Sequence, residues 1–401
     1  MPDPITEELL SNTREEVALR PKEDLPAALQ TRIFNTIKDI PPEHWQQLFP
    51  GVVEGYYFFK SLEESHLEQF AFHYIAVYRG KTLVGAAPCF SMNYPLETTM
   101  QGKLKDLVCM IKKIFPGFLT LRALICGVPM GSHGRIGLPD RSPEVFSAIL
   151  SGLERVAREH KLPIVAFKDF GAEDQDLLDT LQSRDFYKFK SLPSTEMRID
   201  FKDFEDYLMK LDQPKRADLR RKFKKADGQV KLDLEVTRDL GGALDEAFAL
   251  FRQTEARGDT QFEKLPKEFF ANIAKNMPEE TRYFLWRIDG KLVAVNLCQV
   301  SGSHFVGHYV GFDYAIAHQY HLFFVRFRDL LRWCIENKIA RYEMGNTSYK
   351  AKKTLGFKRV PLFVYAKHLD PRFNPFFKLI CKLFKPENFE DVLKEPENGS
   401  S

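Results

Sequence analysis

The strongest pattern of apolar and polar positions lies between residues 305 and 344. Residues 305–312 form a short aromatic run that predicts a buried strand. Apolar residues then recur at helical spacing over residues 321–337, and residues 339–344 form a second short strand pattern. The pattern predicts a strand, a helix and a strand, with a right-handed crossover if the two strands are parallel neighbours.

The first half of the chain repeats this order of elements. Residues 73–90 read as a hairpin, as do residues 282–300 in the second half. A helix pattern over residues 143–160 is followed by a strand pattern over residues 163–168, in the order described above. Because the elements repeat although the residues differ, the sequence predicts two copies of one α/β unit, with the junction near Asp200.

These patterns divide the chain into four parts. Residues 1–28 are rich in charge and proline and are expected to be a disordered tail. An N-terminal unit over 29–200 and a C-terminal unit over 201–370 are each expected to contain a mixed sheet, and residues 371–401 an amphipathic basic helix and tail. Residues 104–125 are interpreted as an inserted helix with a loop that covers a pocket.

Composition limits the class of protein. A chain of 401 residues with 44% hydrophobic content is globular, and a net charge of +3 requires neither nucleic acid nor membrane as a partner. Six scattered cysteines without a CxxC pair favour buried thiols in a reducing compartment over disulfides or a metal site. Neither a signal peptide pattern nor a membrane-span pattern is found, so a cytoplasmic protein is expected.

Two segments have the composition of anion-binding sites. Gly127, Gly131 and Gly134 flank Ser132 and His133, either as an irregular connection or as backbone that approaches a phosphate. The most basic stretch covers residues 215–225 in a predicted helix, where residues 216, 220 and 224 share one edge. It is interpreted as a clamp for phosphate or carboxylate, or alternatively as a solvated face.

Several motifs of the second half resemble Fem-type peptidoglycan aminoacyl ligases and related N-acyltransferases built from two GNAT-like halves. The resemblance implies an α/β fold of two tandem GNAT-like (acyl-CoA N-acyltransferase) units and acyl transfer to an amine. The matching features are Tyr309-x-Gly311, Trp333 late in the helix, the run Tyr342-Glu343-Met344-Gly345, and Lys352 four residues before Gly356.

The resemblance also implies a set of binding residues. Double-GNAT proteins carry a Lys/Arg-rich segment at the start of their second half and a recurrent arginine further on. The expected substrate- and cofactor-binding residues are therefore Arg216, Arg220, Arg221, Arg257, Gly311 and Lys352.

Transfer of an acyl group to an amine requires a base and a donor for the developing oxyanion. Asp313, His308 and Glu343 lie at the predicted strand ends and are the candidate bases, while Tyr309 is expected to contact a carbonyl or phosphate oxygen. Strand alternation predicts that His308 faces one side of the sheet, and Tyr309 and Asp313 the other. The structural alternatives are a turn-capping role for Asp313 and a hydrogen-bonded strand histidine for His308.

The substrates follow from the resemblance only in outline. Residues 314–320 lack the glycine-rich loop of acyl-CoA-dependent GNAT enzymes. The expected co-substrate is acyl-CoA or another acyl thioester, with an acyl carrier protein or aminoacyl-tRNA as alternatives, and no permanently bound cofactor or metal is expected. The expected acceptor is an amine of a lipid or envelope precursor, including a long-chain, sphingoid-like amino alcohol. The alternatives are a tRNA-dependent ligase acting on a peptidoglycan precursor and a non-catalytic binding module.

Residues 371–389 have the pattern of an amphipathic basic helix. This composition is typical of peripheral contact with a membrane surface, and the alternative is docking of the aromatic face on the protein. The apolar arc holds Phe373, Phe376, Phe377, Leu379, Ile380, Leu383 and Phe384, and the basic residues are Lys378, Lys382 and Lys385.

Overall fold

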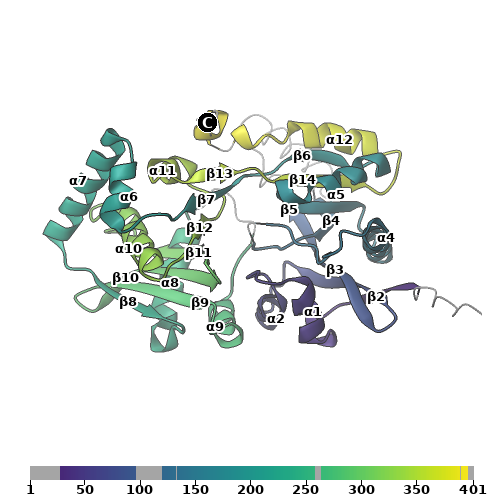
Figure 1. Cartoon of the computed structure of the whole chain (residues 1–401), viewed down its shortest axis with the longest axis horizontal. Helices are drawn as coiled ribbons and strands as arrows, with labels where there is room; N and C mark the ends of the chain where they lie inside the picture. Colours follow the sequence, from purple (N-terminus) through teal and green to yellow (C-terminus); the bar gives the residue numbers. More distant parts are fainter. Residues whose placement is uncertain (1–27, 96–119, 132, 258–262, 389, 396–401) are drawn as a thin grey trace, which may run out of the picture.

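A computed structural model describes residues 28–95, 120–131, 133–257, 263–388 and 390–395. Figure 1 shows two mixed sheets with helices packed around them, which confirms the predicted α/β fold class. Among the described helices, none combines the length and apolarity that a membrane span requires. The predicted tail over residues 1–28 falls almost entirely outside the described residues.

The first sheet has seven described strands in the order β1-β2-β3-β4-β5-β14-β6. Strands β4 and β5 are parallel, and the long helix α4 (Pro143–Glu159) makes the crossover between them. The strands are β1 (Leu29–Phe34), β2 (Ala71–Arg79), β3 (Thr82–Pro95), β4 (Thr120–Cys126), β5 (Ile164–Phe170), β6 (Tyr187–Lys190) and β14 (Phe363–His368).

The second sheet has seven described strands in the order β13-β7-β12-β11-β10-β9-β8. Strands β11 and β12 are parallel, and α10 (Leu322–Glu336) makes their crossover, as the sequence predicted. The strands are β7 (Ser194–Arg198), β8 (Asp233–Thr237), β9 (Thr281–Ile288), β10 (Lys291–Ser301), β11 (His304–Phe312), β12 (Arg341–Met344) and β13 (Lys358–Val360).

The two sheets exchange one strand each. Strand β7 follows β6 in the chain but lies between β12 and β13 of the second sheet, and β14 lies between β5 and β6 of the first. Each sheet therefore contains a strand from the other half of the chain. The ranges 29–200 and 201–370 describe the order of elements, and we expect neither to fold alone, because each would lack an internal strand.

The remaining helices pack on the outer faces of these sheets and between them. Helices α2 and α9 join the halves directly, since the Asn276 amide donates to the Glu64 carboxylate at 2.9 Å and Ser61 Oγ lies 3.3 Å from the Asn272 carbonyl oxygen. These helices are α1 (Pro42–Leu48), α2 (Tyr56–Glu64), α5 (Gln175–Leu178), α6 (Phe204–Lys210), α7 (Gln213–Gln229), α8 (Leu244–Glu255), α9 (Lys267–Asn276), α11 (Tyr349–Thr354) and α12 (Asn374–Leu383).

Two segments differ from the sequence-based expectation. The predicted inserted helix over residues 104–125 is wrong for residues 120–125, which belong to β4 and continue the first sheet. Residues 96–119 lie outside the described residues. Strands β1 and β8 were not predicted, because both are edge strands and most residues of β8 are exposed.

Gly311 allows helix α8 to pack directly against strand β11. A β-carbon at this position would lie 2.6 Å from the backbone nitrogen of Phe251 and 2.7 Å from the carbonyl carbon of Leu250. We predict that Gly311→Ala lowers the free energy of unfolding by about 1–3 kcal/mol, because backbone atoms cannot move aside without shifting α8. Denaturant unfolding tests this, with Gly345→Ala as the control, because a β-carbon there meets nothing within 4 Å. Equal stability of both variants would contradict it.

Candidate functional site

A β-bulge lies in the middle of strand β11. Between Gly307 and Val310 the strand gains one residue relative to β10, which interrupts the alternation of side chains. The rings of the consecutive residues His308 and Tyr309 stack, with centroids 6.4 Å apart and an interplanar angle of 21°. The predicted placement of these two side chains on opposite sides of the sheet is therefore wrong, because the bulge turns them to the same side.

Glu343 of strand β12 lies at the centre of a buried polar group between the two halves. Its side chain is 4% exposed, and its Oε1 lies 3.3 Å from Nδ1 of His133. Ser194 Oγ donates to the same oxygen at 3.0 Å, and Nε2 of His304 lies 3.2 Å from Oε2. Because Ser194 belongs to β7, the strand exchange helps to build this arrangement.

His304 lies between Arg341 and Glu343. A guanidinium nitrogen of Arg341 lies 3.0 Å from Nδ1 of His304, and arginine is only a donor, so Nδ1 accepts. Nε2 lies 3.2 Å from the Glu343 carboxylate without the geometry of a hydrogen bond. Burial raises the pKa of the Glu343 carboxyl, but the contacts with His133 and His304 outweigh it, so the pKa lies well below its usual range.

His133 is the closest histidine partner of Glu343 in the first half of the chain. Burial lowers the pKa of its imidazole, but the hydrogen bond and the charge of Glu343 raise it by more, so the net shift is upward. His133 lies within the glycine-rich segment, which packs on β5: the Gly134 nitrogen donates to the Asp169 carbonyl oxygen at 2.7 Å. This segment carries His133 into the site.

His308 is a neutral imidazole beside two carboxylates. It is partly buried, its Nε2 is shielded from solvent, and this nitrogen has no hydrogen-bond partner among the described residues. Burial lowers its pKa, against the charges of Glu54 and Glu343. Glu54 is buried, and its carboxylate lies 3.6 Å from the Arg135 guanidinium. We call Glu54, His133, His304, His308 and Glu343 the interunit cluster.

Tyr309 is held by a carboxyl group. Its hydroxyl donates to Glu263 at 2.9 Å. Burial raises the pKa of Glu263 above its usual value although the Tyr309 hydroxyl opposes this shift, and the charge of Lys168 in the first half also acts on it. Tyr309 and Glu263 therefore border the interunit cluster where the halves face each other.

Strands β11 and β12 diverge next to His308. Their parallel pairing ends at Gly307 and Met344, where β12 stops, while β11 continues to Phe312. Strands that separate leave backbone N–H and C=O groups of β11 facing the gap. This gap begins at the residue before His308 of the interunit cluster.

Lys352 closes the far side of this gap. Its side chain is buried and donates to the carbonyl oxygens of Met344 and Gly345. Burial, then the charge of Arg326, lowers its pKa to about 7. Lys352 therefore stabilises the end of β12, and its protonation changes near neutral pH.

Asp313 occupies the turn after β11 and lies outside the interunit cluster. Its backbone oxygen accepts from Ala317, its carboxylate accepts from the Ala315 nitrogen at 3.1 Å, and Lys291 lies 2.7 Å away. At about 3.3 Å per residue, it lies about 16 Å along the strand from His308. These contacts match the turn-capping alternative.

The predicted binding arginines lie apart from the interunit cluster, and three of them are on α7. Arg216 donates to the Met209 and Leu211 carbonyl oxygens, and so caps the end of α6. Arg220 pairs with Glu205 at 2.6 Å and Arg221 with Asp218 at 2.6 Å, both on the surface. Arg257 lies over the Tyr314 ring, 4.3 Å from its centroid. The predicted role of Gly311 in substrate binding remains a prediction beside its contact with α8.

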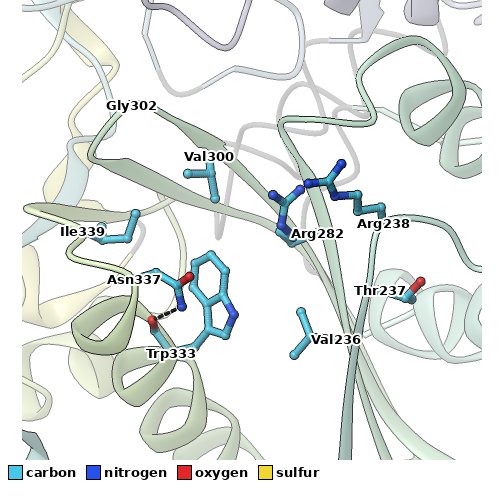
Figure 2. A pocket seen from close by; sticks show the side chains of 9 residues that line it. All are labelled: Val236, Thr237, Arg238, Arg282, Val300, Gly302, Trp333, Asn337 and Ile339. Carbon is cyan, nitrogen blue, oxygen red and sulfur yellow. Dashed lines mark hydrogen bonds between the residues drawn. The ribbon is translucent and has the colours of Figure 1, made fainter.

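A separate open hollow of about 460 Å³ lies beside the C-terminal end of α10. Figure 2 shows Trp333 and Asn337 of α10 on one side of it and Arg238 and Arg282 on the other. None of its lining residues belongs to the interunit cluster.

Sequence reasoning missed part of the cluster. Glu54, His133 and His304 were not proposed as site residues, since they come from a loop, the glycine-rich segment and the start of a strand. One signal was present: a histidine between glycines, in a segment without a helix or strand pattern.

Comparison with known proteins finds a domain match in the second half of the chain. Residues 213–358 match the acetyltransferase (GNAT) domain. Two curated relatives, each named "Putative 8-amino-7-oxononanoate synthase 2" from Mycobacterium tuberculosis strains, are 26% identical over 334 residues; the match covers 79% of this chain and 42% of theirs. The chain thus spans less than half the length of these relatives.

Among solved structures, the crystal structure of FemX matches with a TM-score of 0.57 and 13% identity, covering 87% of this chain and all of that one. A tandem GNAT protein from the clavulanic acid biosynthesis pathway matches with a TM-score of 0.48 and 12% identity, covering 86% of this chain and 99% of that one. The chain therefore carries a match to the GNAT domain in its second half and shares the fold of FemX over both halves.

Proposed function

We propose that the protein transfers an acyl group from an acyl thioester to the amine of a lipid or envelope precursor, with the chemistry at the interunit cluster. The observation that carries this is His308, a neutral imidazole beside Glu54 and Glu343 and next to the gap between β11 and β12. Within the described part of the chain its Nε2 has no hydrogen-bond partner. Neutral histidine is a suitable general base near neutral pH.

Besides His308, the proposed reaction uses the two carboxylates and the backbone of β11. An ammonium group is attracted by the two carboxylates and loses one proton to Nε2 of His308. The free amine attacks the thioester carbonyl in the gap, where backbone N–H groups of β11 stabilise the oxyanion. The C–N bond forms and the C–S bond breaks. The attacking nitrogen gives its second proton to the departing thiolate, and His308 releases the first proton to solvent, so the products are an amide, a thiol and one proton.

Basic residues next to α10 suit a phosphate-bearing donor. Helix α10 starts just beyond the diverging end of β11, and burial together with the charges of Lys225, Lys222 and Arg221 lowers the pKa of His321 at its start. These charges and the helix N-terminus favour an anion. They take the place of the missing glycine-rich loop, and we propose acyl-CoA as the donor, with an acyl carrier protein as the alternative.

The acceptor we propose is a long-chain compound that carries an amine beside an oxygen-bearing carbon, such as a sphingoid-like amino alcohol. The name of the mycobacterial relatives refers to 8-amino-7-oxononanoate, a chain with an amine next to a ketone. An N-acyltransferase acting on such an amine would consume the type of product that this name describes.

The second candidate is a tRNA-dependent aminoacyl ligase, which the similarity in fold to FemX and the exposed basic residues of α7 favour. A panel assay separates the two. Purified protein is given long-chain acyl-CoA or aminoacyl-tRNA with either an amino alcohol or a peptidoglycan precursor, and products are identified by mass spectrometry. We expect an N-acyl amino alcohol only with acyl-CoA. A product only with aminoacyl-tRNA supports the ligase, and no product with any pair supports the binding module.

The variant Asp313→Asn tests whether Asp313 stabilises the turn or acts in the reaction. We predict a loss of about 1 kcal/mol in unfolding free energy, from the weakened pair with Lys291 and the altered turn, and amide turnover within about twofold of wild type. Chemical denaturation and steady-state kinetics measure both effects. A large loss of turnover with unchanged stability would restore Asp313 as the base.

A further inference from the structure

Helix α12 is fixed on the first sheet through one of its faces. The Asn374 side chain accepts from the His368 nitrogen at 2.9 Å and donates to the Asp185 carbonyl oxygen at 2.9 Å. Cys381 is buried, and the Phe384 ring packs edge-on against Phe189 of β6. Figure 1 shows α12 lying along β6 and β14. Docking on the protein, one of the two expectations for this segment, is therefore observed.

A second face of the same helix remains uncovered. Phe373, Phe376, Leu379 and Leu383 are 53–55% exposed, and they account for four of the eight exposed large hydrophobic residues in the described part of the chain. At about 100° per residue they fall within an arc of about 120° on one side of the helix. We call these four residues the exposed α12 face. Phe373 also contacts the His368 ring, with centroids 5.5 Å apart. Because the helix docks through a different face, the two expectations are compatible.

The charged residues of the helix itself are all positive. Residues 371–386 contain Arg372, Lys378, Lys382 and Lys385, with Asp370 and Glu387 just outside. Arg372 pairs with Asp370 at 2.6 Å and Lys378 lies 3.6 Å from Asp185, while Lys382 and Lys385 are exposed. An apolar stripe next to two exposed lysines is complementary to a bilayer surface with anionic headgroups.

The size of the face argues against a second protein chain as its occupant. Four half-exposed side chains present roughly 350 Å², on the basis of about 150–250 Å² for a fully buried aromatic side chain. A stable protein interface needs about 800 Å² per partner. A lipid surface has no such requirement, because each side chain inserts independently.

We propose that the exposed α12 face binds the surface of anionic membranes. Phe373, Phe376, Leu379 and Leu383 enter the region between headgroups and acyl chains, and the flanking cations contact the headgroups. The attachment is weak and reversible, as expected for a short helix without a covalent lipid anchor. The inference rests on α12 alone and does not depend on the proposed acyl transfer.

The test is co-sedimentation of the full chain with vesicles of phosphatidylcholine alone or mixed with phosphatidylglycerol. We expect binding to the mixed vesicles that weakens with salt, and at least tenfold weaker partitioning for Phe376→Ser combined with Leu379→Ser. Met209→Ser is the matched control, since Met209 is 60% exposed on α6. Lys382→Glu with Lys385→Glu should weaken binding to mixed vesicles without changing the apolar face.

Thermal unfolding and light scattering complete the experiment. Equal melting temperatures show that the serine variant is folded, as expected for half-exposed side chains. Wild-type protein that fails to bind mixed vesicles, or a folded serine variant that binds as well as wild type, overturns the proposal. A wild-type dimer that the serine substitutions convert to a monomer also overturns it, since the face would then be a protein interface.

Discussion

Replacement of His308 by glutamine is expected to lower the turnover of amide formation by about 100- to 10,000-fold, the range typical for loss of a general base. Glutamine keeps a polar side chain beside Glu54 and Glu343 but has no nitrogen that can accept a proton. The Michaelis constants for both substrates should change little, because His308 acts on the departing proton. Steady-state kinetics with separately varied donor and acceptor measures these quantities.

Two controls accompany the measurement on His308→Gln. His318→Gln removes an exposed histidine from the turn between β11 and α10 and should leave turnover unchanged. Thermal unfolding shows whether the His308 variant is folded. A folded His308→Gln protein with wild-type turnover would exclude this imidazole as the base.

Replacement of Glu343 by alanine is expected to lower the free energy of unfolding by about 3–5 kcal/mol, because it removes the buried partner of a pair with His133. The matched control is Glu196→Ala, directly across from Glu343 on β7, where the carboxylate is 26% exposed and pairs with Arg341 at 3.5 Å. A pair at the surface should contribute less than about 1 kcal/mol. Denaturant unfolding compares the two variants.

The loss of unfolding free energy caused by Glu343→Ala should depend on pH. The pKa of Glu343 is lowered in the folded protein, so its contribution is complete above the unfolded pKa of about 4.3 and is lost as pH falls toward the folded pKa. The pKa of His133 is raised, so its contribution is complete below about 6.5 and is lost as pH rises through the folded pKa. The difference in unfolding free energy between wild type and Glu343→Ala should therefore be largest between about pH 4.5 and 6.5. A difference that is constant from pH 3 to 9 would contradict this.

The repeated order of elements could be predicted because it depends on local pattern. The hairpins, the helices α4 and α10 and the short strands after them follow from periodicity within each segment. The exchange of β7 and β14 could not, because no local signal says which sheet a short strand joins. That choice depends on pairing between residues far apart in the chain, such as Arg341 with Arg198 and His368 with Ile164.

Only the site residues on the neighbouring strands β11 and β12 could be predicted from the sequence. His308 and Glu343 were placed at neighbouring strand ends, and the structure brings both into the interunit cluster. Their partners Glu54 and His133 come from the other half of the chain and meet them only through tertiary packing. The bulge at His308 was also invisible in the sequence, since alternation assumes an unbroken ladder.

The most direct test of N-acyl transfer at the interunit cluster uses a labelled acyl group. Purified protein is incubated with acyl-CoA labelled with ¹³C at the carbonyl carbon and with a long-chain amino alcohol. Mass spectrometry quantifies the amide, and a thiol reagent quantifies free CoA. We expect one labelled amide per free thiol for wild type and for His318→Gln, and neither product above background for His308→Gln. Thiol release without amide, or the same amide yield from His308→Gln as from wild type, would contradict N-acyl transfer at the interunit cluster.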